Sequence, residues 1–207
     1  MSRYTGPRIK VLRALGVDLP GLSRKSMSAR PQPPGQHGAR KSVSGRHSEY
    51  GMQLMEKQKL RFNYGLSERQ LRRVVLDAKR QKAQTGGKIV EFLERRLDNL
   101  VFRAGFAPTI PAARQLVSHG HIQLNGRRVT VPSIRVKTGE IFGPTEDGKK
   151  LDVVRASLQE PALSRPEWIA LDDATLSATL THVPDGLDAA PFPLDLQRVV
   201  EYYAKRI

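Results

Sequence analysis

Residues 17–47 restrict most strongly what this chain can fold into. The segment is rich in Pro, Gly, Ser and Arg, and three prolines lie within residues 31–38. Proline fixes φ and removes a backbone donor, so residues 31–38 cannot form a helix. The segment also has too few apolar side chains to build a core of its own. We therefore expect residues 1–47 to be an extended basic arm that is ordered mainly by a partner.

Positive charge is concentrated in the first two-thirds of the chain. The 207 residues contain 35 Lys and Arg against 20 Asp and Glu, a formal net charge of +15. Residues 1–143 carry +19 and residues 144–207 carry −4. A polyanion would therefore bind the first part and avoid the last. Arg outnumbers Lys by 23 to 12. Guanidinium groups bind phosphate in a bidentate way and stack on bases, so this bias favours nucleic acid as the partner.

Several classes of protein and of site are excluded by composition. The chain has no Cys, which excludes disulfides and Cys-ligated zinc or iron–sulfur sites. No apolar run approaches the roughly 20 residues of a membrane helix. The first seven residues lack the apolar region of a signal peptide. We expect a soluble, intracellular protein.

Helical spacing predicts a helical domain over residues 48–92, completed by residues 190–207. Ser48 is the expected N-cap of a helix to about Phe62, and the capping box at residues 67–70 begins a second helix. A third helix is predicted from Lys88 to Arg103, with Gly105 as its C-cap. Shorter helices are expected over residues 8–15 and 195–205.

The hydrophobic pattern changes beyond residue 109. A helix capped by Thr109 ends at Gly120, and a hairpin with a type I′ turn at Asn125 and Gly126 follows. A further strand pair is predicted from residues 134–136 and 141–142, then a helix over residues 150–158 and strands over residues 168–171 and 175–183. The expected fold class is α+β: the arm, the helical domain, an inserted domain of two helices and a small antiparallel sheet over residues 93–158, and C-terminal strands and a helix over residues 159–207.

The sequence lacks the common motifs of catalytic sites. It contains no phosphate-binding loop, no nucleophile elbow and no His-Glu-x-x-His motif. His119 and His121 could ligate a metal, but no third ligand lies near them in sequence, so contact with RNA or a hydrogen bond to backbone is the better interpretation. We expect no enzyme activity, no metal and no cofactor.

Basic and polar groups cluster between the third helix and the hairpin. Arg95, Arg96 and Arg103 lie on the third predicted helix, and Arg114 and Gln115 on the fourth. If the hairpin packs beside these helices, the groups converge on one face with the polar residues of the hairpin. Structured RNA is recognised by such contacts to phosphate and 2′-hydroxyl groups.

Three stretches resemble the αL RNA-binding motif: LERRLDN (93–99), ARQLVSHGHI (113–122) and LNGRRV (124–129). The flanking sequence resembles the family of small ribosomal subunit protein number four, of bacterial or plastid type. The matching segments are MSRYTGP (1–7), PPGQHG (33–38), EKQKLR (56–61), YGLSERQ (64–70) and VVEYY (199–203).

This resemblance implies a structural protein of the small ribosomal subunit that binds the 5′ domain of its RNA early and nucleates assembly of the subunit body. It also implies a position near the channel through which messenger RNA enters, contacts with ribosomal proteins three and five, an influence on translational accuracy, and a location on cytoplasmic ribosomes or those of an organelle. Many members of this family have a Cys cluster near the N-terminus that can bind zinc. This sequence has no Cys, so the resemblance implies no zinc site here. The RNA-binding residues that we predict are Arg3, Tyr4, Arg8, Gln36, His37, Arg46, Lys57, Lys59, Arg61, Arg69, Arg72, Arg95, Arg96, Arg114, Gln115, His119, Gly120, His121, Asn125, Arg127 and Arg128.

Two alternatives carry the same motif. A pseudouridine synthase would place it before a large catalytic domain, but only 64 residues follow position 143, and their net charge is −4. A ribosome-recycling or stress factor would be smaller and would lack the N-terminal arm.

Overall fold

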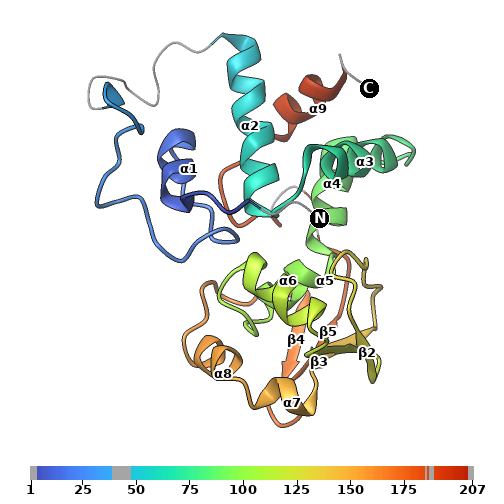
Figure 1. Ribbon diagram of the computed structural model, residues 1–207. Helices are drawn as coiled ribbons and strands as arrows, with labels where there is room; N and C mark the ends of the chain where they lie inside the picture. The colour runs from blue at the N-terminus through green and yellow to red at the C-terminus, as the bar shows by residue number, and fades with distance from the viewer. Residues whose placement is uncertain (1–3, 39–47, 185, 187–188, 205–207) are drawn as a thin grey trace. The chain divides into compact units, whose positions relative to one another are not determined.

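The computed structural model describes residues 4–38, 48–184, 186 and 189–204. The chain forms two compact units: residues 1–90 with 186–207, and residues 91–185. The first unit is helical and the second contains the sheet, so the α+β prediction is confirmed (Figure 1). None of the helices in the described ranges is long and apolar enough to cross a membrane.

The helical unit is built around α2 and α9. Its helices are α1 (Arg8–Leu15), α2 (Glu49–Asn63), α3 (Glu68–Lys79), the first part of α4 (Thr85–Glu94) and α9 (Leu196–Ala204). The predicted capping box is present at the start of α3, where Ser67 and Gln70 bond reciprocally. The core contains Leu60, Leu71, Val199 and Tyr203, all of which are at most 2% exposed. The C-terminal helix therefore shares a core with α2 and α3.

Part of the expected arm packs against α2. Leu12, Leu19 and Leu22 are buried, and the Gly21 N–H donates to Asn63 Oδ1 at 3.0 Å. Arg13 donates to the carbonyl oxygen of Gln32 at 2.8 Å, which fastens the proline-rich run to α1. The described part of the arm thus makes contacts within the chain, which its composition did not indicate.

The second unit is a five-stranded antiparallel sheet with helices beside it. Its elements are α5 (Leu97–Arg103), α6 (Ile110–Ser118), β1 (Ile122–Leu124), β2 (Arg127–Val129), β3 (Ile141–Pro144), α7 (Glu146–Lys149), α8 (Asp152–Gln159), β4 (Ile169–Asp172) and β5 (Ser177–Leu180). The strand order is β2-β1-β3-β5-β4. Asn125 (φ 50°) and Gly126 (φ 75°) form the two-residue turn between β1 and β2, as predicted.

Two predicted elements differ from the structure. The helix predicted from Lys88 to Arg103 is broken: α4 ends at Glu94, and α5 begins at Leu97 after Arg96 adopts an extended conformation. Residues 134–136 form no strand of a pair. Instead, Arg135 makes an isolated antiparallel bridge with Arg96, and β3 pairs with β1 and β5. Both differences have one cause, because residues 132–136 bind the backbone at the helix break.

Candidate nucleic-acid interface

The break between α4 and α5 is held by residues 132–136, which we call the strap. The Leu97 N–H donates to the carbonyl oxygen of Ile134 at 2.8 Å, and the Asp98 N–H donates to that of Pro132 at 3.1 Å. Arg95 bonds with Val136 twice: its carbonyl oxygen accepts from the Val136 N–H at 2.9 Å, and its Nε donates to the Val136 carbonyl oxygen at 3.0 Å. The strap therefore satisfies amides that a helix terminus leaves without intrahelical partners.

Asp98 lies at the centre of a buried ion-pair cluster. Arg96 donates to both of its carboxylate oxygens, at 3.0 and 2.9 Å, and Arg114 Nη2 donates to Oδ2 at 2.7 Å. The side chains of Asp98, Arg96 and Arg114 are 1%, 9% and 15% exposed. Two guanidinium groups thus share one carboxylate, and this joins the start of α5 to α6.

A second buried pair lies at the end of α4. Arg103 Nε lies 3.3 Å from Glu94 Oε2, and Asn99 Nδ2 donates to the same oxygen at 2.9 Å. Arg103 also lies over the ring of Trp168 at 5.4 Å. Arg95 pairs with Glu91 at 3.0 Å. The four arginines expected on the third and fourth helices are therefore all engaged with acidic groups of the same unit.

The corner between α6 and β1, residues 119–121, is contacted by Arg128 of β2. Arg128 Nη2 donates to the carbonyl oxygen of His119 at 3.1 Å, and the rings of His119 and His121 lie 6.3 Å apart. Gly120 has φ +74°, and a Cβ atom there would collide with the Arg128 guanidinium. The positive φ favours glycine at this position, and a Cβ atom there would also require the Arg128 side chain to move.

The turn between β1 and β2 is fixed by Asn125. Its Oδ1 accepts from the Ile141 N–H at 2.9 Å, and its Nδ2 donates to Glu140 Oε1 at 3.2 Å. These bonds tie the turn to the start of β3. The neighbouring Arg127 is consequently presented on a fixed hairpin.

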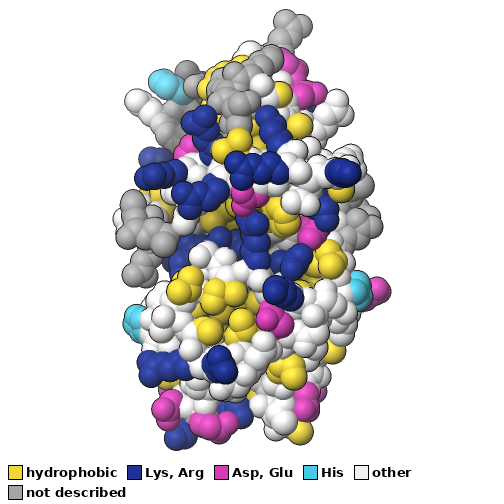
Figure 2. Space-filling model, turned by 90° about the vertical axis from the view of Figure 1, so that its right-hand side faces the viewer, with side chains coloured by type: hydrophobic (Ala, Val, Ile, Leu, Met, Phe, Trp, Pro, Cys, Tyr) yellow, Lys and Arg dark blue, Asp and Glu magenta, His cyan; other side chains and the backbone are white. Residues whose placement is uncertain are grey.

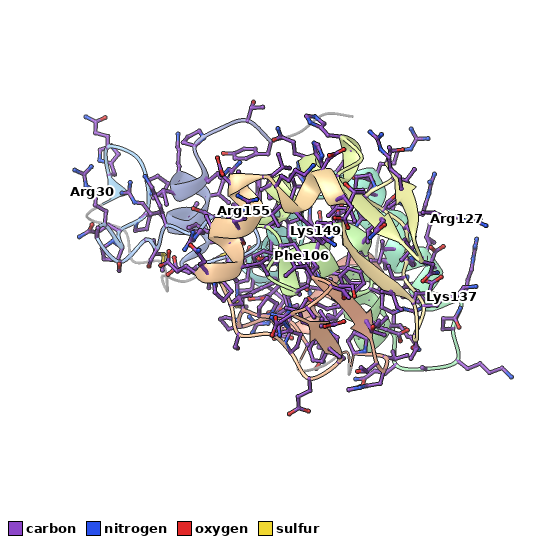
Figure 3. All side chains as sticks on the ribbon, turned by 90° about the horizontal axis from the view of Figure 1, so that it is seen from below. Arg30, Phe106, Arg127, Lys137, Lys149 and Arg155 are labelled. Atoms are coloured by element: carbon purple, nitrogen blue, oxygen red, sulfur yellow. The ribbon has the colours of Figure 1, made fainter. Side chains whose placement is uncertain are left out.

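Exposed cations of the sheet-containing unit lie along the hairpin and the segment after it. Arg127, Arg128 and Lys137 are all exposed. Figure 3 shows Arg127 and Lys137 extending outward from the same side of this unit. Arg135 is also exposed and lies over the Phe92 ring at 4.3 Å. Lys137 was not among the residues predicted to bind RNA, although it is a Lys close in sequence to the motif.

The helical unit contributes a second set of exposed cations, mainly on α3. Arg69 and Arg72 are exposed there, opposite the buried Leu71 and Val75. Arg73 is exposed on the same helix and was missed, although its spacing placed it away from the apolar face. On the face drawn in Figure 2, Lys and Arg side chains predominate over Asp and Glu.

The other residues of the helical unit that were predicted to bind RNA differ in how exposed they are. Tyr4, Arg8, Gln36 and His37 are exposed, and Tyr4 packs edge-on against Phe62 at 5.3 Å. Lys57 and Lys59 are buried and paired, at 2.8 Å with Glu68 and at 2.7 Å with Glu56. Arg61 is half-buried over the Phe62 ring. Of the remaining sites, Gln115 is exposed on α6, whereas Arg3 and Arg46 lie outside the described residues.

Glu68 connects three elements of the helical unit. It pairs with Lys57 of α2 and accepts a hydrogen bond from the Tyr203 hydroxyl of α9 at 2.8 Å. Burial acts to raise the pKa of Glu68, but the hydrogen bonds from Lys57 and Tyr203 outweigh it and hold the pKa below its usual value. Burial and the bond to Glu68 raise the pKa of Tyr203. The carboxylate therefore supports the docking of α9.

Among the described residues, Glu91, Glu94 and Asp98 of this site are all held in ion pairs with arginines. Asp98 is buried and pairs with two guanidinium groups. In the part of the chain that the structure describes, no group of three or more His, Cys, Asp or Glu could hold a metal ion. What the site does offer is a set of exposed guanidinium groups on rigid elements.

Comparison with known proteins agrees with this arrangement. Residues 3–94 match the family "Ribosomal protein S4/S9 N-terminal domain", and residues 95–142 match the "S4 domain". The chain is 58% identical to the small ribosomal subunit protein uS4 of Methylobacillus flagellatus over the whole of both chains. The chain belongs to the uS4 family. It is likewise 57% identical to uS4B of Nitrosomonas europaea over the full length of both. A cyanobacterial uS4, from Synechococcus elongatus, is 47% identical and also covered in full.

Membership of the uS4 family establishes the general role of the chain. The family consists of structural proteins of the small ribosomal subunit and not of enzymes. The chain is accordingly a structural ribosomal protein, and both enzymatic and recycling-factor alternatives are dropped. The boundary between the two matches, at residues 94 and 95, falls at the break between α4 and α5.

Proposed function

We propose that the chain binds the 5′ domain of small-subunit ribosomal RNA directly, at an early stage, and thereby nucleates assembly of the subunit body. The observation that carries this proposal is the set of exposed Arg and Lys side chains on α3 and on the β1–β2 hairpin, in a region of +19 net charge. Such groups bind phosphates and 2′-hydroxyls of folded RNA by shape and charge. In the cell the proposed place of action is the cytoplasmic ribosome.

The predicted residues divide into two roles according to their burial. Exposed members would contact RNA directly, and they are Tyr4, Arg8, Gln36, His37, Arg69, Arg72, Gln115, His119, Asn125, Arg127 and Arg128, with Lys137 and Arg73 added. Arg3 and Arg46 keep their proposed contacts. Buried or paired members would hold these groups in position, and they are Lys57, Lys59, Arg61, Arg95, Arg96 and Arg114, with Gly120 and His121 shaping the corner.

Contacts with neighbouring molecules form the second part of the proposal. We place the chain beside ribosomal proteins three and five, near the channel through which messenger RNA enters, where its contact with protein five would influence accuracy. The family resemblance supports this placement. The acidic balance of residues 144–207 supports a role for that region in protein contacts, since it disfavours RNA.

A binding competition tests the central part of the proposal. The purified chain is mixed with a labelled 5′-domain fragment of small-subunit RNA, without other ribosomal proteins, and retention on a filter is measured. We expect saturable binding of the labelled fragment. An unrelated folded RNA of equal length should compete for the chain at least ten-fold less well than the unlabelled fragment. Binding that needs another ribosomal protein, or equal competition by the unrelated RNA, would contradict direct and early recognition.

A further inference from the structure

The segment that forms β4 and β5 is depleted of positive charge. Residues 166–197 contain six Asp or Glu and no Lys or Arg, in a chain with 35 Lys and Arg. The two strands form one end of the sheet, whereas β2, with Arg127 and Arg128, forms the other edge (Figure 1). The two edges of one sheet therefore differ in charge. Phosphate is attracted to the β2 edge and repelled by the β4 edge.

The hydrogen bonds of β5 establish which backbone groups of β4 point outward. The Leu180 N–H donates to the carbonyl oxygen of Glu140, and the Leu180 carbonyl oxygen accepts from Gly139, so the polar groups of Leu180 point toward β3. Leu180 pairs with Ile169, and antiparallel pairs alternate in the direction of their polar groups. Ile169 and Leu171 therefore direct their backbone N–H and C=O groups away from β5.

One of these outward groups already has a partner. The Ile169 N–H donates to the carbonyl oxygen of Pro166 at 3.1 Å. The Ile169 carbonyl and both backbone groups of Leu171 make no hydrogen bond with another described residue. Edge groups of this kind are the template on which a further strand adds.

Side chains around this edge specify the chemistry of the added strand. Glu167 lies just before β4, and Asp172 and Asp173 lie at its end; all three are exposed. On the outer face of the sheet, Ala170 pairs with Thr179, which in turn pairs with the half-exposed Ile141. The edge is thus bounded by acidic groups at both ends and has an uncharged row between them.

We propose that the outer edge of β4 binds an extended, basic segment of another protein of the small subunit by strand addition. The segment would carry Lys or Arg near each end of a short run of uncharged residues. Glu167 and Asp173 are six positions apart, about 20 Å along a strand, so these basic residues would be separated by a similar span. The inference rests on membership of the uS4 family and not on the proposed RNA contacts.

Cross-linking in assembled subunits identifies the occupant of the edge. The chain has no Cys, so an Asp173→Cys variant can be labelled at one place with a photoactivated benzophenone and assembled into small subunits. We expect the adduct to map, by mass spectrometry, to an extended Lys- or Arg-bearing segment of one ribosomal protein. An adduct with RNA, an adduct with a helix, or no adduct would overturn the proposal. Asp147→Cys, at an exposed position on α7, controls for non-specific reaction.

Hydrogen exchange then tests strand addition itself. We expect amide exchange in the peptide that contains Leu171 to be at least ten-fold slower in assembled subunits than in the isolated chain. The double variant Glu167→Lys/Asp173→Lys should lose this protection, whereas Glu146→Lys/Asp147→Lys, with the same change of charge, should keep it. Equal exchange in the isolated chain and in subunits would overturn the proposal. Both double variants should bind the 5′-domain RNA at least as well as the original chain, and a loss there would concern the proposed function instead.

Discussion

Asp98 Oδ2 and Arg114 Nη2 lie 2.7 Å apart and join α5 to α6 beneath the proposed RNA-binding surface. Arg96 completes the cluster from the other side of the same carboxylate. The sequence motif made Arg96 and Arg114 attractive candidates for contact with RNA. In the structure their guanidinium groups bind the buried Asp98 carboxylate and join α5 to α6.

We expect Asp98→Ala to lower the free energy of unfolding by about 3–5 kcal/mol, because it leaves two buried guanidinium groups without their shared carboxylate. Denaturant unfolding followed by circular dichroism measures this change. Asp147→Ala is the control, since Asp147 is 87% exposed and should change stability by no more than about 0.5 kcal/mol. Equal effects of the two substitutions would contradict a structural role for the cluster.

We expect Arg127→Ala to weaken binding to the 5′-domain RNA by about 1–3 kcal/mol, because an exposed, charge-assisted contact is lost. The dependence of affinity on salt should also become shallower, and the unfolding curve should not move. Filter binding at several salt concentrations checks both expectations.

Arg114→Ala is the matched comparison for Arg127→Ala, because it removes the same side chain from a buried pair. It should lower stability, while the RNA affinity of the folded chain falls less than in Arg127→Ala. If Arg114→Ala instead weakened RNA binding more and left stability unchanged, the assignment of roles by burial would be wrong.

Gly120→Ala should destabilise the fold by about 1–2 kcal/mol, because a left-handed conformation is unfavourable for a residue with a Cβ atom. It should also displace the Arg128 guanidinium from the His119 carbonyl. Thermal unfolding measures the first effect, and loss of RNA affinity by the folded chain measures the second. Gly126→Ala is a useful control, since its φ is also positive but nothing lies within 4 Å of an added Cβ atom. Equal loss of affinity in both variants would argue against the role of the corner.

Glu68→Gln should lower the free energy of unfolding at pH 7 by about 1 kcal/mol. The effect is small because the carboxylate is half-exposed and solvent screens its ion pair. The pKa of Glu68 is lower in the folded chain, so its contribution is complete above the ordinary carboxyl pKa and disappears as the pH falls through the folded-state value. The stabilities of the variant and the original chain should therefore converge at acidic pH. A difference that stayed constant from pH 7 to pH 3 would show that charge is not responsible. Glu146→Gln, on the exposed side chain, provides the control.

Local signals in the sequence predicted most elements of the fold. Ser67 and Gln70 predicted the start of a helix, and Asn125 with Gly126 predicted a tight hairpin. Both predictions succeeded because capping boxes and two-residue turns depend only on residues that are close in sequence. The break at Arg96 could not be found this way, since residues 93–103 have helical spacing throughout. Its cause is the strap about 40 residues later, which competes for the same backbone groups.

The site was predicted less completely than the fold. Charge and motif singled out these helices and the hairpin, but they do not distinguish an exposed arginine from one that pairs with a buried acid. Arg127 and Arg114 look alike in sequence, and only the position of Asp98 separates them. Lys137 and Arg73, which we propose as further contacts, lie outside the motif itself.

The salt dependence of RNA affinity tests the central claim, which is that exposed cations in residues 1–143 bind folded RNA through its phosphates. The measurement is the equilibrium affinity of the full chain for the 5′-domain fragment between 50 and 200 mM salt. If about 6–10 phosphates are contacted, affinity should fall roughly 10³–10⁵-fold over this range, by analogy with duplex DNA. An affinity that hardly changes with salt would contradict the account.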